Sequence, residues 1–217
     1  MKTLNQYIKE KLIVNKNYRD TKISEPKSFD ELRKIIEDRY DKLGEGTEQN
    51  PIDFNDIDVS NLDSFYDKNK EGIFRNTKFK YIDISDWDVS NVKSMRSMFY
   101  DCKKLKSVGD ISSWDVSSVE NTSNMFYNCK KLKSVGDISK WDVSNVAYMY
   151  SMFCACHYLN PDLSDWNVSN VTDMTYMFLD CKSFNQDLSD WDVSNVRYRI
   201  SMFKGCPIKE EYKPKFK

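Results

Sequence analysis

The sequence holds a single histidine, His157, and only six glycines, and each shortage excludes a class of site. Nucleophilic catalysis needs a base and a group that orients it, and the lone histidine lies in no such pattern. The G-x-S-x-G, phosphate-loop and H-E-x-x-H patterns are absent as well. We therefore expect a protein that is not an enzyme, with no catalytic residue, no cofactor and no small-molecule substrate.

Cys154 and Cys156 lie next to His157 and raise the question of a zinc site. Structural zinc needs four ligands, usually in spaced pairs such as C-x-x-C, and this chain has no such pair. The six cysteines also lack the context of a secreted disulfide framework. We expect them to be small core residues in a reducing compartment, without a bound metal.

The chain also lacks an excess of charge and a long apolar run. Lysine and arginine (33) almost cancel aspartate and glutamate (34), whereas nucleic-acid binders usually carry a strong basic excess. No stretch approaches the ~18 apolar residues of a membrane span, and Lys9, Glu10 and Lys11 interrupt the apolar core that a signal peptide needs. We expect no nucleic-acid partner, membrane span, signal peptide or lipobox, which leaves a cytoplasmic or particle-associated protein as the default.

What the sequence does hold is a repeated phrase, W-D-V-S-N-V, followed by M-F and then Cys. Its tryptophans are spaced 27, 27, 25 and 25 residues apart, and a cysteine follows each tryptophan by fifteen residues. The two columns are Trp87, Trp114, Trp141, Trp166 and Trp191, and Cys102, Cys129, Cys156, Cys181 and Cys206. Two columns in one register indicate a structural unit copied in tandem.

A degenerate copy precedes these five. It reads I-D-V-S-N-L, with Ile57 in the tryptophan position, and Phe74 and Thr77 take the phenylalanine and cysteine positions. The distance from Ile57 to Phe74 is 17 residues, against 12 in the other copies. We therefore expect a five-residue insertion near residues 67–71 of this first copy.

A unit of this size cannot bury its apolar face alone, so successive copies must stack. Apolar residues recur at about every third position, which fits a short strand starting near the Asn-Val pair and a tight helical turn holding Met-Phe and Cys. We expect a repeat solenoid of six coils over residues 51–208, leucine-rich-repeat-like, with parallel β-strands and short helical turns. At ~4.8 Å a coil it would form a rod about 30 Å long.

The segments on either side of the repeat lack this pattern. Thr3 can cap a first helix, and Ser28 with Glu31 forms a capping box for a second one. The apolar stripe of the second helix is Phe29, Leu32, Ile35, Ile36 and Tyr40, and Gly44 and Gly46 end it. We expect residues 1–50 to be a small α-helical N-terminal cap on the first coil, or a segment that docks the chain elsewhere, and residues 209–217 to be a basic tail.

Several columns have both a structural and a functional interpretation. We expect the tryptophans in the core, each indole N–H donating to a neighbouring Ser or Asp backbone group, and the alternative is a ladder that stacks a ligand. The asparagines predict an amide ladder. The acidic columns favour Asx-type turns, with calcium as the alternative, although calcium-binding β-rolls have glycine-rich loops. These columns are Asn61, Asn91, Asn145, Asn170 and Asn195; Asp83, Asp110, Asp137, Asp162 and Asp187; and Asp58, Asp88, Asp115, Asp142, Asn167 and Asp192.

Positions that vary among the copies indicate where a partner would bind. Side chains in the rows between the fixed Val and Met residues, and in the row before the second Met, should point outward, and tyrosine and arginine gather there in the later coils. The candidate partner-binding residues are Tyr148, Tyr150, Tyr176, Arg197 and Tyr198 on this face, and Lys103, Lys104, Lys106, Lys130, Lys131 and Lys133 in two copies of a K-K-L-K-S-V-G-D loop. The alternatives are scattered solvated side chains and a lysine edge that blocks aggregation.

The phrase W-D-V-S-N-V-x-x-M-x-x-M-F-x-x-C resembles the repeat of BspA-like leucine-rich repeat surface proteins, including the mycoplasma lipoprotein type. The resemblance covers residues 57–206. It implies a parallel β solenoid of the leucine-rich repeat kind, roles in adhesion or protein–protein contact, and no catalytic residues. The family is often found on the bacterial surface, and this chain departs from it in having no signal peptide or lipobox.

These observations predict a non-catalytic protein–protein interaction module that binds a protein partner through the solenoid face and the lysine-edged loops. The alternative, from a different class, is a structural component of a larger particle, such as a virion or a surface layer, docked by its N-terminal helices.

Overall fold

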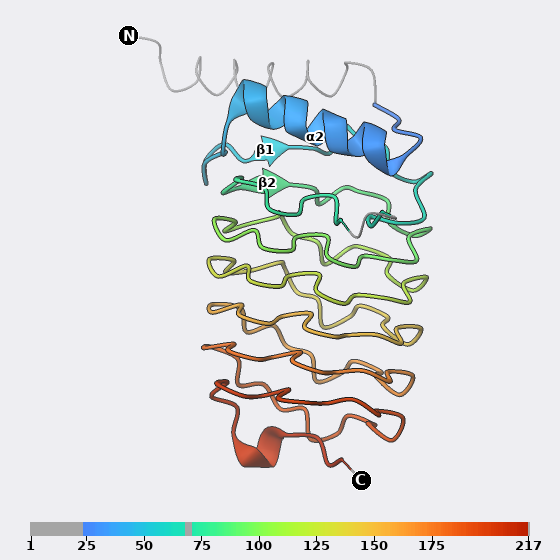
Figure 1. Ribbon diagram of the computed structural model, residues 1–217, viewed down its shortest axis with the longest axis vertical. Coiled ribbons are helices and arrows are strands. Elements are labelled where there is room, and N and C mark those ends of the chain that lie inside the picture. The colour runs from blue at the N-terminus through green and yellow to red at the C-terminus, as the bar shows by residue number, and fades with distance from the viewer. Residues whose placement is uncertain (1–23, 68–70, 217) are drawn as a thin grey trace.

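The computed structural model describes residues 24–67 and 71–216. The chain winds through successive coils stacked along the long axis, with α2 (Phe29–Leu43) across the N-terminal end and the short 3-10 helix η1 (Glu210–Tyr212) at the other end (Figure 1). Two short strands, β1 (Ile52–Asp53) and β2 (Ile82–Asp83), pair in parallel. Within the described ranges, no helix is long and apolar enough to cross a membrane. We number the coils 1 to 6, from the Ile57 copy to the Trp191 copy.

Backbone hydrogen bonds join each coil to the next. Over residues 95–101 of coil 2, the odd-numbered N–H groups donate to carbonyls of coil 3, at 2.8–2.9 Å. The N–H groups of residues 98, 100 and 102 instead donate to the carbonyl three residues earlier. Isolated parallel bridges join Ser64, Ser94, Asn121, Tyr148, Asp173 and Tyr198 in one row across the six coils. Each coil therefore alternates between bonding to its neighbour and bonding to itself.

This alternation replaces the expected strand and helical turn. The strand near the Asn-Val pair is reduced to one bridged residue per coil, and the Met-Phe-Cys segment consists of turns rather than helix. The reason is that this segment has one position with a left-handed backbone in coil 1 and two in each later coil, the second of coil 6 being Gly205, and a helix cannot contain such positions. The non-glycine residues in these positions, with φ between 51° and 62°, are Asn76, Ser97, Asp101, Asn124, Asn128, Ser151, Ala155, Tyr176, Asp180 and Ser201.

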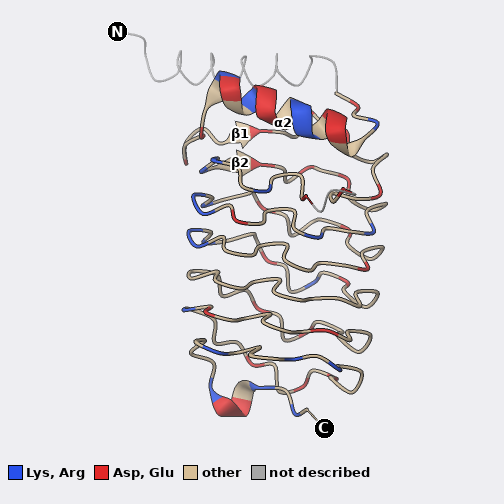
Figure 2. Ribbon diagram, viewed as in Figure 1, with Lys and Arg blue, Asp and Glu red and all other residues tan. Residues whose placement is uncertain are grey.

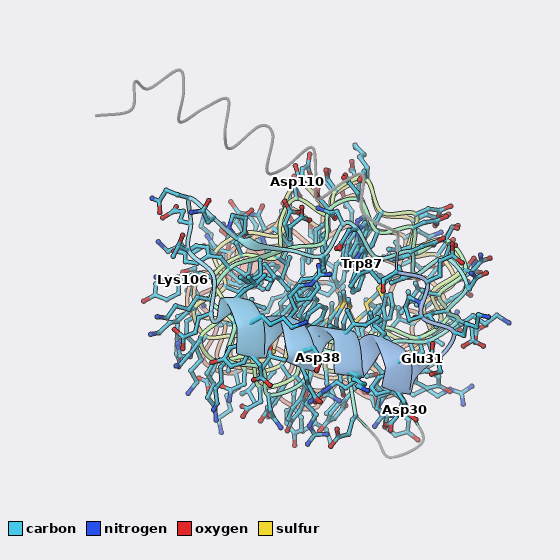
Figure 3. The ribbon with its side chains drawn as sticks, turned by 90° about the horizontal axis from the view of Figure 1, so that it is seen from above. Asp30, Glu31, Asp38, Trp87, Lys106 and Asp110 are labelled. Carbon is cyan, nitrogen blue, oxygen red and sulfur yellow. The ribbon has the colours of Figure 1, made fainter. Side chains whose placement is uncertain are left out.

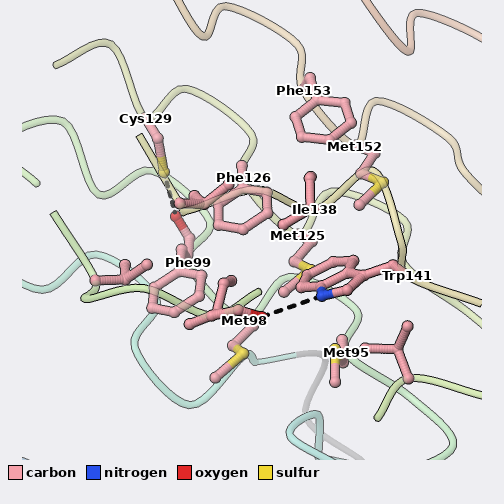
Figure 4. Packing of buried hydrophobic residues seen from close by; sticks show 14 of the residues in the cluster. Met95, Met98, Phe99, Met125, Phe126, Cys129, Ile138, Trp141, Met152 and Phe153 are labelled. Atoms are coloured by element: carbon pink, nitrogen blue, oxygen red, sulfur yellow. Dashed lines mark hydrogen bonds between the residues drawn. The ribbon is translucent and has the colours of Figure 1, made fainter. Parts of the chain in front are cut away.

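The tryptophan column lies in the core, as expected, with each side chain 3–5% exposed. The ring of Trp141 stacks between Trp114 and Trp166, with centroids 6.3 and 6.4 Å away. The expected hydrogen-bond acceptor was wrong: Trp141 Nε1 donates to the carbonyl of Ile111 in the preceding coil, at 3.1 Å (Figure 4). Because the indole turns inward, the groups within its reach are carbonyls of buried apolar residues. The same bond recurs from Trp87, Trp114, Trp166 and Trp191 to Phe54, Ile84, Ile138 and Leu163.

Phenylalanine and cysteine form two further columns in this core. Rings in the phenylalanine position stack coil upon coil, with centroids 5.3–5.8 Å apart. All six cysteines are free, as expected, and five of them are buried. The thiol of Cys129 donates to the Phe99 carbonyl of the preceding coil at 3.1 Å (Figure 4), and Cys102, Cys156 and Cys181 repeat this bond. The cysteine column is therefore a structural part of the stack.

The acidic columns form Asx turns, which confirms the structural interpretation. In both columns the side-chain oxygen Oδ1 accepts the backbone N–H of the serine two residues later, at 2.9–3.2 Å. These hydrogen bonds, from the serine hydroxyl first and the backbone N–H second, lower the pKa of several carboxyl groups. The affected residues are Asp58, Asp115, Asp137, Asp142 and Asp187.

Acid is therefore expected to destabilise the protein through these turns. A carboxyl pKa that is lower in the folded chain stabilises the fold fully above the unfolded aspartate value of about 3.9, and this stabilisation is lost as the pH falls through the lowered folded value. Thermal denaturation at a series of pH values should show a melting temperature that declines below about pH 4.

The double variant Asp115→Asn and Asp142→Asn is the control for this prediction. Asn167 occupies the same column and accepts the Ser169 N–H at 3.2 Å, so an amide preserves the turn without a titrating group. The variant should lose less stability on acidification than the wild type. An unchanged dependence on pH would show that these turns do not carry the effect.

The asparagine column differs from the expected amide ladder. Asn145 Nδ2 donates to the carbonyl of Ser117 in the preceding coil at 2.7 Å, and Asn91, Asn170 and Asn195 make the equivalent bond at 2.7–3.0 Å. The amides do join neighbouring coils, but through backbone carbonyls rather than through one another. A backbone carbonyl of the preceding coil lies within reach of each of these asparagines, so their amide groups are satisfied without hydrogen bonds to one another.

Helix α2 covers the first coil, and its expected capping holds. The Ser28 side chain accepts the Glu31 N–H at 3.2 Å, and the Gly44 N–H donates to the Tyr40 carbonyl, where the helix ends. Leu32 and Ile36 are fully buried. Seen from the N-terminal end, α2 lies across the stack (Figure 3). Residues 24–50 therefore form a cap, whereas the predicted first helix, from Thr3 to Leu12, lies outside the described residues.

Two arginines fasten this cap to the coils below it. Arg39 makes two hydrogen bonds to the Asp56 carboxylate, at 2.6 and 2.9 Å, and its guanidinium lies 4.9 Å from the centre of the Phe54 ring. Arg33 donates to the carbonyls of Gly72 and Ile73. Both side chains leave the apolar stripe of α2 free to pack on the core.

The insertion in coil 1 lies where the sequence predicts it. Asp67 N–H donates to the Glu71 carbonyl, and an antiparallel bridge joins Tyr66 to Gly72. The Ile73 N–H then donates to the Phe65 carbonyl, so the coil resumes directly after the loop. The residues that flank the insertion thus pair with one another, and residues 68–70 lie outside the described part of the chain.

The C-terminal segment differs from the expected basic tail. Residues 209–216 cover coil 6: the Tyr212 carbonyl accepts the Leu188 N–H at 2.8 Å, and Tyr212 and Phe216 pack against the core. Arg199 stands where coils 2, 4 and 5 have a core methionine, and its guanidinium lies 4.7 Å from the centre of the Phe216 ring. The segment is a C-terminal cap because the last coil would otherwise expose its apolar cross-section.

Candidate functional site

Large apolar side chains gather on one surface of coils 4 to 6. Tyr148, Asp173 and Tyr198 are joined by parallel bridges, and Tyr150 and Ile200 lie two residues further along their own coils, so their side chains point the same way. Tyr148 is 50% exposed, Tyr198 60% and Ile200 63%. We call the set Tyr148, Tyr150, Tyr176, Tyr198 and Ile200 the tyrosine face.

Ile200 is the member that the sequence prediction missed. Its position holds Arg96 in coil 2 and Ser123 in coil 3, so an exposed isoleucine there is unusual. The signal was present in the comparison of copies, because an apolar residue had replaced polar ones at a varying position. Isoleucine simply lacks the association with binding surfaces that tyrosine and arginine have.

Tyr176 differs from its neighbours on the face. It is half-buried, its backbone is left-handed (φ 58°), and its ring meets that of Tyr150 edge-on, with centroids 5.9 Å apart. The expectation that this row points outward was wrong, since Ser97 and Ser151 are buried in the equivalent positions. The left-handed turn brings these side chains against the coil, and only the length of the tyrosine takes its ring to the surface.

Coil 5 places short polar side chains between the aromatic ones. Asp173 separates Tyr148 from Tyr198 in the bridged row, and its carboxylate accepts the Thr175 N–H at 2.8 Å. Arg197, also predicted, is exposed beside Tyr198. The surface therefore combines aromatic rings, one carboxylate and one guanidinium on a backbone that is hydrogen-bonded from coil to coil.

The predicted lysines lie at one edge of the stack, on the loops of coils 2 and 3 (Figure 2). Part of their charge is compensated within the chain: Lys103 pairs with Asp101 at 2.9 Å, and Lys104 with Glu45 at 2.6 Å. Lys130 and Lys131 are exposed, and neither forms an ion pair with a carboxylate among the described residues. In coil 2, by contrast, Lys106 Nζ contacts the hydroxyl and the ring of Tyr81, so the least compensated pair of neighbouring lysines on this edge is Lys130 and Lys131 of coil 3.

Glu45 is the residue through which the cap meets this edge. Hydrogen bonds from Lys104 and Lys80 lower the pKa of Glu45 to about 2. The same contact raises the pKa of Lys104. Sequence reasoning missed Glu45, because a contact between the end of the cap and a loop of coil 2 follows from no local pattern.

The cysteines beside His157 are not arranged for metal binding or nucleophilic chemistry. Burial raises the pKa of Cys154 to about 11, and it also raises the pKa of Cys156, whose thiol donates to the Phe126 carbonyl at 3.0 Å. A thiolate, the form that binds metals and attacks substrates, is therefore disfavoured at both. In the described part of the chain, no group of three or more His, Cys, Asp or Glu side chains could hold a metal ion.

The comparisons with known proteins give a family but no described relative. A family model described as "Mycoplasma protein of unknown function, DUF285" matches residues 45–135 and 131–211. No curated protein and no solved structure matches the chain. The two matched ranges together span the six coils and the first residues of the C-terminal cap. The chain therefore belongs to the DUF285 family, a group of mycoplasma-type repeat proteins.

Proposed function

We propose that this protein is a non-catalytic protein-binding module, a solenoid of the BspA-like leucine-rich repeat type, whose tyrosine face contacts a protein partner. The observation that carries the proposal is the exposure of Tyr148, Tyr198 and Ile200, at 50%, 60% and 63%, on one surface of coils 4 to 6. Exposed apolar side chains gathered in a patch mark interaction surfaces, whereas scattered ones do not. Tyrosine and arginine are also the residues that most often dominate binding energy.

The rigidity of the surface supports the same function. The bridged row runs through all six coils, and the N–H groups of Met149, Ser151 and Phe153 donate to carbonyls of coil 5 at 2.9–3.0 Å. Side chains on such a backbone lose little conformational freedom when a partner binds. The aromatic rings are therefore pre-positioned for contact.

The alternative is a structural component of a larger particle, docked by the N-terminal helices. Helix α2 offers little for such docking, since Leu32 and Ile36 are already buried against coil 1. Docking would then fall to residues 1–23, and the tyrosine face would have no assigned role. The interaction module accounts for more of the described surface.

Alanine substitution tests the tyrosine face. In the double variant Tyr148→Ala and Tyr198→Ala, affinity for a partner captured from the native organism should fall by about 30-fold or more, as expected when a hot-spot residue worth ~2 kcal/mol is removed. Binding isotherms of the purified partner give the measurement. Tyr158→Ala is the matched control, because Tyr158 is 58% exposed but follows the core Cys156 and lies outside the face. Equal affinity of the double variant and the control would reject the face.

A further inference from the structure

A cationic column follows the core cysteines. The residue directly after each cysteine is Lys103, Lys130, His157 and Lys182 in coils 2 to 5. The backbone around the column is in register from coil to coil: the N–H of the residue before each cysteine donates to a carbonyl of the next coil at 2.8 Å. Four positively charged or titratable side chains are therefore stacked at one edge.

A second column, directly before the cysteines, decides how this charge is compensated. It holds Asp101, Asn128, Ala155 and Asp180, all with a left-handed backbone (φ 57–62°). In coil 2, Asp101 pairs with Lys103 at 2.9 Å, and in coil 5, Asp180 pairs with Lys182 at 2.6 Å. In coils 2 and 5, at the two ends of the column, the lysine is therefore paired with a carboxylate of its own coil.

Coils 3 and 4 lack these carboxylates. Asn128 stands before Lys130 and Ala155 before His157, and in the described ranges Lys130 forms no ion pair with an acidic side chain. The left-handed backbone that places a carboxylate beside a lysine in coils 2 and 5 recurs in coils 3 and 4, but there it carries no carboxylate. Coil 3 therefore presents a lysine, and coil 4 a titratable imidazole, without the carboxylate found in coils 2 and 5.

The electrostatics around His157 agree with this geometry. Burial lowers the pKa of His157 first, and the neighbouring Lys130 and Lys182 lower it further, opposed only by Asp180. The two lysines thus repel a proton on His157, in the middle of the column. A carboxylate brought to this point from outside would relieve that repulsion.

We propose that Lys130 and His157 form a receptor site for a carboxylate in an acidic segment of a protein partner. The proposal rests on the proposed protein-binding function and adds the chemistry of the bound group. A carboxylate is favoured over a phosphate chain because coils 2 and 5 show carboxylates in the equivalent place, and because the chain as a whole carries a net charge of only -1. Exposed Lys131 beside the site can contact the rest of the segment.

His157 is the only histidine, so the NMR signals of its imidazole C–H protons report on this site without overlap from another histidine. The probe is a hexaglutamate peptide, titrated at low salt into the full chain, with hexaglutamine as the uncharged control. A bound carboxylate stabilises the imidazolium form, so hexaglutamate should raise the pKa of His157, and by linkage it should bind more tightly as the pH falls through that pKa. Hexaglutamine should change neither.

Two substitutions at one position make the sharpest test. Ala155→Asp places a carboxylate where coils 2 and 5 have one, and it should weaken hexaglutamate binding by about fivefold or more, the effect expected of one exposed ion pair, while raising the pKa of His157 without ligand. Ala155→Asn fits the left-handed backbone equally well but adds no charge, and it should change binding by less than about twofold. Lys130→Met should weaken binding as Ala155→Asp does, whereas Lys103→Met removes a lysine that Asp101 already compensates and should have little effect.

The proposal is overturned if hexaglutamate leaves the His157 signal unchanged, or if Ala155→Asp binds it as tightly as Ala155→Asn does. It is also overturned if inorganic phosphate or heparin binds with the Lys130 dependence described above while hexaglutamate does not, because the site would then select phosphate or sulfate polymers. Failure of the proposed function is separate: the tyrosine variants would keep full partner affinity while hexaglutamate still shifted the pKa of His157.

Discussion

Replacing Trp141 by alanine is expected to lower the free energy of unfolding by about 3–5 kcal/mol, among the largest effects of any single substitution in this chain. The side chain is 4% exposed, its ring stacks between Trp114 and Trp166, and its N–H satisfies the Ile111 carbonyl at 3.1 Å. Alanine would leave a cavity between three coils and a buried carbonyl without a donor. Urea denaturation of the two proteins measures the difference.

Trp191→Ala, in the last coil, is the control for this prediction. Stability in stacked repeats is close to a sum of contributions from each unit and from its interfaces with neighbours. Trp191 has only one neighbouring coil of the repeat, on its N-terminal side, so its loss should cost less than the loss of Trp141. A Trp141→Ala variant that unfolds within about 1 kcal/mol of the wild type would contradict the stacked core.

Replacing Gly72 by alanine is expected to destabilise the protein by about 3 kcal/mol or more, the upper part of the range for overpacking. A Cβ atom at Gly72 would overlap the carbonyl group of Ser97 in the next coil, and both atoms it meets there belong to the backbone. The Ser97 carbonyl accepts the Tyr100 N–H at 3.0 Å, so it cannot move away without disturbing that turn of coil 2. The melting temperature and urea midpoint of the variant should both fall.

Gly44→Ala separates the two ways in which a glycine can be required. A Cβ at Gly44 meets no atom within 4 Å, but its backbone has φ 75° and ψ −144°, which L residues rarely adopt, so alanine there costs backbone strain alone, about 1–3 kcal/mol. At Gly72 the backbone conformation is one that alanine adopts without strain, but the Ser97 carbonyl leaves no space for a Cβ atom. Equal losses for the two variants would show that close approach of coils 1 and 2 is not what selects Gly72.

The sequence was most informative where one residue type recurs in register. Trp141 and Cys129 were expected in the core, and the structure buries both against carbonyls of the preceding coil. The Asx turns were expected from their Asp-x-Ser spacing, since an Asx turn is a local feature that two residues determine. The cap followed from Ser28 and the apolar stripe of α2 for the same reason.

The turns inside each coil could not be predicted in the same way. A left-handed position is recognised in a sequence mainly through glycine, and less strongly through asparagine and aspartate, whereas half of the non-glycine residues in these positions, such as Ser97, Ala155 and Tyr176, belong to none of these types. Such residues reach this conformation because the neighbouring coils hold the backbone there, not because they favour it. A repeat pattern of buried residues therefore indicated stacking but not the path of the chain between them.

The candidate sites likewise combine features that the sequence predicts with features that depend on how the coils pack. The exposure of Tyr148 and Tyr198 was expected because these positions vary among the copies, but the partial or full burial of the row containing Tyr176 was not, since it depends on the left-handed turn. The lysines were predicted as one patch, whereas the structure divides them by their partners. Lys104 pairs with Glu45 of the cap, and this pairing depends on how the ends of the chain pack.

The central claim is that successive coils lie flush, one spacing apart, with equivalent residues in register. Pulsed EPR between spin labels carried on unnatural amino acids tests it most directly, with one label at Arg197 and the other at Glu120, Lys93 or Asp63, which occupy the same position in coils 6, 3, 2 and 1. At ~4.8 Å a coil, the label separation should grow by one spacing for each coil, from about 14 to about 19 to about 24 Å between backbones. Separations that fail to rise in equal steps, or that spread broadly, would contradict the stacked arrangement.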